Sequence, residues 1–367
     1  MRHLLLYLFA IIFCFAISVL TAIWWTAPSR QINSSPKLKQ SDLLTKTKPS
    51  SKNLFGIKLN GKRGCIDKDG RIAIEPIFDD LRCSADDLIP VKDNDKWGFV
   101  NQIGEIVIEP QFTYAHNFKE GLAVVVINNK HGYIDSSGNY AIRPKFDYAE
   151  DFSEGFAVVG AGAYDFLGNP EYRLTTPKAG FIDKSGNIVI EAKFDYAEKF
   201  SDGLARVTID NKSGFINKSG HFAISPSEEI IGNFSEGLAT TWKNDRLGYV
   251  DKTGKIVIEP QFKQASSFYE GLSSVMVENG KYGFIDKTGK IVIEPQFMMA
   301  DWFSEGFAVV MIDNKKGYID RTGKIVIPVS FDSASQFSDG LSQSGFSDKD
   351  KNNITKGGYI YKTGKTI

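Results

Sequence analysis

Side chains that commonly carry out catalysis or bind metals are scarce in this sequence and share no common spacing. Its four histidines each lie in a different local sequence: His3, His116, His131 and His221. A general base or a metal site needs several such groups to converge on one point, and their spacing does not indicate this. The G-x-S-x-G pattern, the phosphate-binding loop and the Cys/His zinc spacings do not occur. We therefore predict no catalytic residue, no metal site and no cofactor.

Acidic residues do recur at regular positions, and paired carboxylates could act as acid and base. One set follows a short apolar run: Glu75, Glu109, Glu191, Glu259 and Glu294. The other set is the aspartate that opens segments such as "DKTGK", where lysine stands in place of the second oxygen ligand of a calcium loop. Aspartate favours turns, and a glutamate at a strand end is normally solvated. We interpret both sets as structural.

Aromatic residues also recur, always directly after a glycine. Such a stripe could stack on sugar rings or hold the apolar side chains of a partner. A role in the hydrophobic core is the favoured interpretation. The residues are Phe99, Tyr133, Phe181, Phe215, Tyr249, Phe284, Tyr318 and Tyr359.

These recurring residues belong to one unit that is repeated nine times, most often with a period of 34 residues. Each copy contains a segment of the form "GFID", preceded by variable residues and opened by Gly64, Gly98, Gly132, Gly180, Gly214, Gly248, Gly283, Gly317 or Gly358. Fixed self-similarity at this length is typical of a repeat array. One unit alone is too thin to offset its ordering entropy, so we expect the units to stack.

Each unit is predicted to be a three-stranded meander. "GFID" and "KIVIEP" are β-prone, and "DKTG" between them has aspartate and glycine where a hairpin turn needs them. The second glycine occurs in all nine copies, which indicates a backbone with positive φ. In the connection "FDYAEKFSDG", the spacing of Phe194, Ala197 and Phe200 predicts a tight helical turn. "LARVTI" is the third strand, and the consecutive apolar residues of "IVI" indicate strands covered on both faces.

The predicted architecture is an all-β, open superhelical array of nine three-stranded units of about 34 residues. A closed, propeller-like ring is the alternative. Propeller blades usually have four strands and about 40 residues or more, so the short unit favours the open array.

The unit resembles the bacterial WG (or KWG) β-repeat, whose pattern residues 96–126, "KWGFVNQIGEIVIEPQFTYAHNFKEGLAVVV", follow closely. The resemblance extends over about residues 54–367. Only Trp97 keeps the tryptophan that gives the family its name. The resemblance implies a bacterial surface or exported protein and supplies no catalytic residues.

The longest interruption of the repeat is "GAGAYDFLGNPEYRLTTPKAG", which follows Val159. It lies in the hairpin between the third strand of one unit, equivalent to "LARVTI", and the "GFID" strand of the next unit. Insertions at one phase of an array project from one edge, where binding surfaces often lie. This one carries candidate partner-binding residues of types that are common at interface hot spots: Tyr164, Phe166, Tyr172 and Arg173. A tolerated surface insertion is the alternative.

The N-terminal part has a different composition. Residues 4–27 carry no charge and are long enough to cross a bilayer of about 30 Å as one apolar helix. We predict a transmembrane anchor or uncleaved signal segment over residues 1–27, a flexible Ser/Lys-rich linker over 28–52 and the repeat domain over 53–367. The export-type N-terminus favours a repeat domain outside the cytoplasm, in the periplasm or at the cell surface. The positive charges after the apolar segment favour the cytoplasmic face instead.

Cysteine and charge content add two expectations. Cys65 and Cys83 could form a disulfide in an oxidising compartment, and two buried thiols are the favoured interpretation. The 44 basic residues balance 44 acidic ones, which does not favour nucleic acid as a partner.

The predicted function is a membrane-tethered, non-catalytic scaffold that binds a protein or polysaccharide. The alternatives are an enzyme centred on the irregular third and fourth repeats, where Asp165 and Glu171 are the available acids, and a passive spacer.

Overall fold

The computed structural model describes residue 49 and residues 53–161, 178–229, 232–348 and 354–367. All of them lie in the unit formed by residues 46–367. They contain the strands β1 to β33 and no helix. Among the described residues, no helix that could span a membrane was found. The predicted anchor, nearly all of the predicted linker and the insertion residues Tyr164, Phe166, Tyr172 and Arg173 lie outside the described part.

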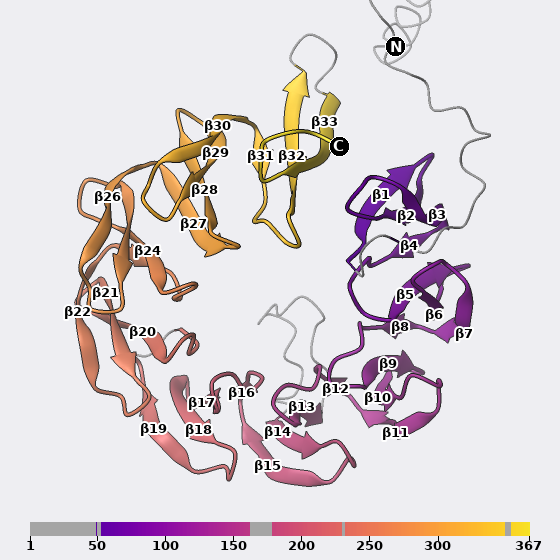
Figure 1. Cartoon of the computed structure of the whole chain (residues 1–367). Helices are drawn as coiled ribbons and strands as arrows, with labels where there is room; N and C mark the ends of the chain where they lie inside the picture. The colour runs from indigo at the N-terminus through magenta and orange to yellow at the C-terminus, as the bar shows by residue number, and fades with distance from the viewer. Residues whose placement is uncertain (1–48, 50–52, 162–177, 230–231, 349–353) are drawn as a thin grey trace, which may run out of the picture. The chain divides into compact units, whose positions relative to one another are not determined.

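The described strands form nine sheets, called blades 1 to 9 here, which follow one another around a ring (Figure 1). Blade 1 contains β1 (Phe55–Leu59), β2 (Lys62–Ile66) and β3 (Ile72–Phe78). Blade 2 contains β4 (Asp80–Leu81), β5 (Leu88–Asp93), β6 (Lys96–Asn101) and β7 (Ile106–Phe112). Blade 3 contains β8 (Tyr114–Ala115), β9 (Ala123–Ile127), β10 (Lys130–Ile134) and β11 (Tyr140–Phe146). Blade 4 contains β12 (Tyr148–Ala149), β13 (Phe156–Ala161), β14 (Lys178–Asp183) and β15 (Ile188–Phe194).

Blade 5 contains β16 (Tyr196–Ala197), β17 (Leu204–Ile209), β18 (Lys212–Asn217) and β19 (Phe222–Ser227). Blade 6 contains β20 (Leu238–Lys243), β21 (Arg246–Asp251) and β22 (Ile256–Phe262). Blade 7 contains β23 (Gln264–Ala265), β24 (Leu272–Met276), β25 (Tyr282–Asp286) and β26 (Ile291–Phe297). Blade 8 contains β27 (Met299–Ser304), β28 (Phe307–Ile312), β29 (Lys315–Asp320) and β30 (Ile325–Phe331). Blade 9 contains β31 (Ser333–Ala334), β32 (Leu341–Asp348) and β33 (Ile354–Tyr361).

A complete blade has four antiparallel strands, and the first of them is usually only two residues long. This inner strand faces the centre of the ring, whereas the last, outer strand lies at the rim (Figure 1). The connection that we predicted as a helical turn supplies the inner strand: Tyr196 and Ala197 pair with Thr208 and Val207. The prediction of a three-stranded unit missed this strand because it is so short.

The ring closes between the last blade and the first. The rings of Phe55 and Tyr359 are 5.3 Å apart, and the Tyr359 hydroxyl donates to the Gly56 carbonyl at 2.9 Å. The Tyr361 hydroxyl donates to the Lys68 carbonyl at 3.0 Å. The prediction of an open superhelical array is therefore wrong, and the fold is a nine-bladed β-propeller. Four strands fit into 34 residues because the inner strand needs only two.

The turn before each outer strand has the predicted chemistry. In blade 6, Asp251 Oδ1 accepts hydrogen bonds from the N–H groups of Thr253 and Lys255, at 2.9 and 3.1 Å. Gly254 in this turn has a φ of 85°, and the equivalent glycine has positive φ in all nine blades. The first glycine of the repeat has a different role. A Cβ on Gly98 in β6 would lie 2.4 Å from the carbonyl oxygen of Ile108 in β7. The strand β6 can therefore approach the outer strand β7 this closely only if residue 98 has no side chain.

The core consists of clusters that each join two neighbouring blades. Phe181 of blade 4 packs with Phe200, Val207 and Ile216 of blade 5. Seven of the eight recurring aromatic residues are at most 1% exposed, which confirms their predicted core role, and Tyr359 lies at the ring closure.

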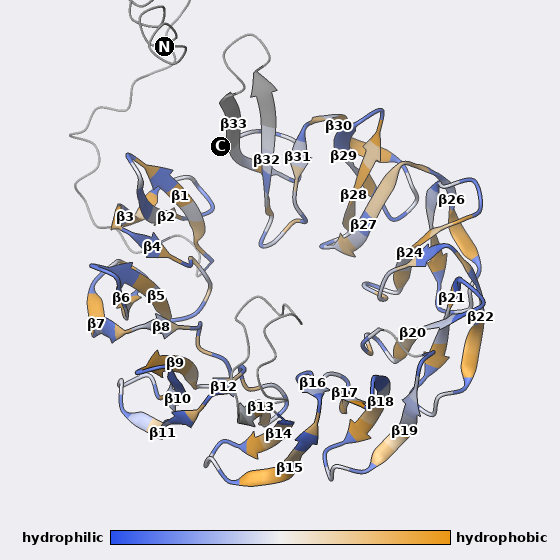
Figure 2. Cartoon of the chain, turned by 180° about the vertical axis from the view of Figure 1, so that it is seen from behind, coloured by the Kyte–Doolittle hydropathy of each residue, from blue (hydrophilic) through white to orange (hydrophobic). Residues whose placement is uncertain are grey.

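The expectation that "IVI" is covered on both faces is wrong. In β7, Ile106 and Val107 are 47% and 48% exposed, and only Ile108 is buried. The outer strand therefore buries only one of these three side chains, and the other two are exposed at the rim of the ring. Figure 2 shows the hydrophobic residues of the outer strands β7, β15 and β22 in orange.

The two cysteines form a disulfide, contrary to the prediction of two free thiols. Cys65 lies in β2, and Cys83 follows the inner strand β4, with Cα atoms 6.0 Å apart. Cys65 is fully buried in the core cluster that joins blades 1 and 2. The bond links these blades because the chain of blade 2 passes next to β2.

A recurring acidic clamp connects blades 3 to 9. The turn after each inner strand ends in Glu-Gly or Asp-Gly, and the acid accepts a hydrogen bond from the turn glycine of the next blade. The acid–glycine pairs, at 2.8–3.1 Å, are Glu120–Gly155, Glu154–Gly203, Asp202–Gly237, Glu236–Gly271, Glu270–Gly306 and Glu305–Gly340. Five of these acids also form an ion pair with a lysine of the next blade.

Candidate functional site: a groove along the inner strands

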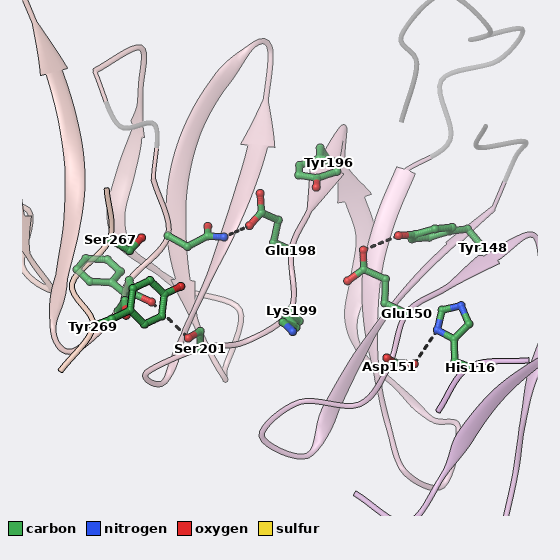
Figure 3. Close-up of a pocket in the computed structure, with 13 residues that line it drawn as sticks. His116, Tyr148, Glu150, Asp151, Tyr196, Glu198, Lys199, Ser201, Ser267 and Tyr269 are labelled. Atoms are coloured by element: carbon green, nitrogen blue, oxygen red, sulfur yellow. Dashed lines mark hydrogen bonds and ion pairs between the residues drawn. The ribbon is translucent and has the colours of Figure 1, made fainter. Parts of the chain in front are cut away.

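A groove of about 670 Å³ runs along the inner edge of five consecutive blades (Figure 3). Its residues come from blades 3 to 7, beginning at His116 and ending at Tyr269. Each lining segment is an inner strand or the few residues that follow it, except in blade 6, where the equivalent segment before β20 lines the groove. The groove is therefore built from one part of the repeat, used five times in succession.

Local packing explains why these residues line a groove. The second residue of the inner strand is a buried alanine, as at Ala149 and Ala197, and a phenylalanine three residues later is also buried, as at Phe152 and Phe200. These two residues fix the segment to the core. The two positions between them remain at the surface, and they hold Glu150 and Asp151 in blade 4 and Glu198 and Lys199 in blade 5.

Hydrogen bonds across blade boundaries hold the lining side chains. His116 Nδ1 lies 2.8 Å from Asp151 Oδ1 of the next blade. Glu198 accepts hydrogen bonds from Arg206 of its own blade and from the Asn233 amide of blade 6. These contacts fix the side chains before any ligand arrives, which lowers the entropy cost of binding.

The carboxylates of the groove differ in electrostatics. Burial raises the pKa of Glu150, and the hydrogen bond from the Tyr148 hydroxyl opposes this shift only in part. The negative charge of Glu198 raises the pKa of Glu150 further, whereas Lys199 lowers it. Glu198 itself is paired with a guanidinium group. The groove thus combines a carboxyl group that is easily protonated with a carboxylate whose charge is compensated.

Exposed aromatic rings lie at the blade 7 end of the groove. Tyr269 and Trp302 are each 41% exposed, and their ring centroids are 5.5 Å apart with an interplanar angle of 37°. Tyr269 lines the main groove, and Trp302 lines a second groove of about 250 Å³ between blades 7 and 8. The aromatic pair therefore contributes one ring to each groove.

The groove was not among the predicted sites. The predicted partner-binding residues Tyr164, Phe166, Tyr172 and Arg173 lie outside the described residues. Of the histidines, His116 lines the groove, whereas His131 does not line it and has a pKa lowered by burial. In the described ranges, no group of three or more His, Cys, Asp or Glu side chains could hold a metal ion. A usable sequence signal was the variation of two adjacent positions between a recurring alanine and a recurring phenylalanine.

Solved structures and a family model of a sequence repeat both match the chain. A crystal structure of the computationally designed Ika8 protein is 14% identical, with a TM-score of 0.44, and the match covers 76% of this chain and 95% of that chain. BamB from Moraxella catarrhalis is 10% identical, with a TM-score of 0.45, and the match covers 84% and 97%. These values are too low to indicate a shared function. No curated protein sequence matches the chain.

The model of the WG containing repeat matches eight consecutive segments: residues 64–97, 97–130, 132–160, 180–212, 214–245, 248–282, 282–315 and 317–343. These segments cover more than half of the sequence, and each of them begins in one blade and ends in the next. The chain therefore belongs to the WG containing repeat family.

Proposed function

We propose that this protein is a membrane-tethered, non-catalytic scaffold that binds an extended protein or glycan along its inner-strand groove. One observation carries the proposal: a single groove crosses five blades, and its side chains are fixed by contacts between blades. A groove of this length suits a polymer rather than a small metabolite.

A location outside the cytoplasm is part of the proposal. The apolar residues 4–27 would provide the membrane tether, and the linker 28–52 would hold the ring away from the bilayer. The Cys65–Cys83 disulfide supports an oxidising compartment, where such bonds persist. Protease treatment of intact cells and of permeabilised cells would test this location. A ring that is degraded only after permeabilisation of the inner membrane would contradict it.

A second candidate function is the hydrolysis of a bound glycan. It is favoured by the two carboxyl groups of the groove, since Glu150 has a raised pKa and Glu198 is held beside a guanidinium group. Glycosidases use such a pair as a proton donor and an ionised partner. This alternative predicts that Glu150→Gln abolishes the release of reducing sugar without abolishing binding.

Photo-crosslinking in living cells tests the binding role of the groove. A photoreactive phenylalanine analogue would replace Ser267, which lines the groove, in the full-length anchored protein. The matched control carries the same analogue at Val292, an exposed residue of the rim. We expect a high-mass adduct from position 267 only. Adducts from neither position, or equally from both, would contradict a partner in the groove.

A further inference from the structure

We infer that the partner is a glycan of uncharged sugar residues, which stacks on an aromatic platform formed by Tyr269 and Trp302. This inference rests on the proposed binding function and names the class of ligand. Sugar rings have apolar C–H faces that pack on aromatic rings, and their hydroxyl groups form hydrogen bonds with polar side chains nearby.

Both platform residues are exceptions to the repeat. The position of Trp302, directly before the buried phenylalanine, is polar in the six other blades that have this phenylalanine: Asn117, Asp151, Lys199, Asn233, Ser267 and Gln336. The position of Tyr269, directly after that phenylalanine, is serine in five blades: Ser153, Ser201, Ser235, Ser304 and Ser338. Two departures from the repeat in neighbouring blades thus place two exposed rings side by side.

The tyrosine replaces a structural contact. In four blades the serine at this position donates a hydrogen bond to the carbonyl of the buried phenylalanine in the next blade, at 2.6–3.3 Å. Tyr269 has no hydroxymethyl group to make that contact. A large aromatic side chain that is 41% exposed contributes little to the core in exchange. Its position is better explained by a ligand than by packing.

The shape of the site favours a chain of several units. The main groove extends over blades 3 to 7 and includes Tyr269, and the second groove lies between blades 7 and 8 and includes Trp302. Asn233 and Glu198 line the main groove, whereas Gln264 and Asp301 line the second. Amide and carboxylate groups in both grooves match the hydroxyl groups of a polymer that crosses the aromatic pair.

The charges of the groove favour an uncharged ligand. Glu198 is paired with Arg206, and Asp151 is hydrogen-bonded to His116. Glu150 lies near Lys199 and has a raised pKa. A strongly charged ligand would have no large opposite charge to meet. An extended peptide is also less favoured, because β8, β12, β16 and β23 are too short to pair with an added strand.

The test is affinity electrophoresis of the full-length protein in detergent. Gels would contain hydroxyethyl cellulose, galactomannan, laminarin or dextran, with polygalacturonate as the charged comparison. Tyr269→Ser and Trp302→Asn restore the residues that other blades use, so both variants should fold. The matched control is Trp242→Thr, because Trp242 is 42% exposed but lines neither groove, and Thr208 is its equivalent in blade 5.

We expect at least one uncharged polysaccharide to retard the wild-type protein. Each platform variant should weaken that binding about tenfold, and Trp242→Thr should leave it unchanged. Retardation by none of the four uncharged polymers, retardation by polygalacturonate alone, or equal binding by the platform variants would overturn the inference. A protein adduct from position 267 in the crosslinking experiment, together with any of these results, would refute the glycan while the scaffold proposal stands.

Discussion

The inter-blade clamps and the inner groove both contain glutamates, and the pKa values of these glutamates are shifted in opposite directions. In the clamps, burial alone would raise the pKa of Glu120, Glu236 and Glu305, but hydrogen bonds from a lysine and a glycine N–H outweigh it. The pKa of each therefore lies below its ordinary value. In the groove, burial and the nearby charge of Glu198 prevail, and the pKa of Glu150 is raised. One set stabilises the ring by being charged, whereas the groove residue costs stability when it is charged.

This contrast follows the repeat itself. The clamp positions hold an acid and a glycine in blade after blade, and the residues serve assembly. The groove positions vary more between blades, and at Tyr269 the variation removes a contact that other blades keep. Positions that keep the same residue type in most blades can thus be assigned to the stability of the ring. Positions at which one blade differs from the others can be assigned to binding.

The largest effect on the stability of the ring is expected at the first glycine of the repeat. In Gly283→Ala, the new methyl group would lie 2.5 Å from the Ile293 carbonyl oxygen, and the backbone there cannot move without breaking the blade. We expect a loss of about 3 kcal/mol or more in the free energy of unfolding, measured in urea. Gly358→Ala is the matched control, because the equivalent Cβ would meet Thr366 Cγ2 at 3.7 Å. An equal loss from both variants would show that the close approach does not limit stability.

The disulfide is expected to have the next largest effect. It closes a loop of 18 residues between blades 1 and 2. Cys83→Ser should therefore lower the free energy of unfolding by roughly 3 kcal/mol relative to the oxidised wild type. Wild-type protein measured with reductant should show the same loss, and Cys83→Ser should no longer respond to reductant.

A single clamp should contribute less, of the order of 1 kcal/mol, because its groups are partly solvated. Since the pKa of Glu305 is lowered in the folded ring, its contribution is complete above the unfolded pKa and disappears as the pH falls through the folded pKa. Glu305→Gln should lower the thermal midpoint at pH 7 and have a much smaller effect below about pH 4. A variant that loses the same stability at both pH values would refute an ionic clamp.

The smallest effect, with the opposite sign, is expected in the groove. Because the pKa of Glu150 is raised, the folded ring binds a proton at this residue more tightly than the unfolded chain does. Its cost appears as the pH rises through the unfolded pKa and is complete above the folded pKa. Glu150→Gln should therefore raise the thermal midpoint slightly at pH 7 and leave it nearly unchanged at low pH. A decrease at pH 7 would mean that the ionised carboxylate supports the ring.

Much of the repeat could be predicted from the sequence because the interactions involved are local. An aspartate and a glycine three residues apart determine the turn before the outer strand, and Gly254 has the predicted positive φ. The inner strand was not predictable, because the spacing of Ala197 and Phe200 fits a helical turn as well as a two-residue strand followed by a bend. Closure of the ring depends on the small angle by which each blade is rotated relative to the one before it. Local sequence patterns do not determine this angle. The pairing of Cys65 with Cys83 likewise depends on the approach of two blades.

The groove was hidden for a related reason. The sequence shows that two positions beside the inner strand vary, but not that five blades align them into one depression. The exposure of Tyr269 and Trp302 also follows from this alignment. A search for residues that break the repeat in neighbouring units would have found both.

The most direct test of the division between construction and binding is the double variant Tyr269→Ser/Trp302→Asn, with thermal unfolding and affinity electrophoresis measured on the same preparation. We predict a thermal midpoint equal to or above that of the wild type, because the variant regains the serine contact, together with loss of polysaccharide binding. A lower midpoint with binding retained would contradict the account, because the two aromatic residues would then serve the ring and not a ligand.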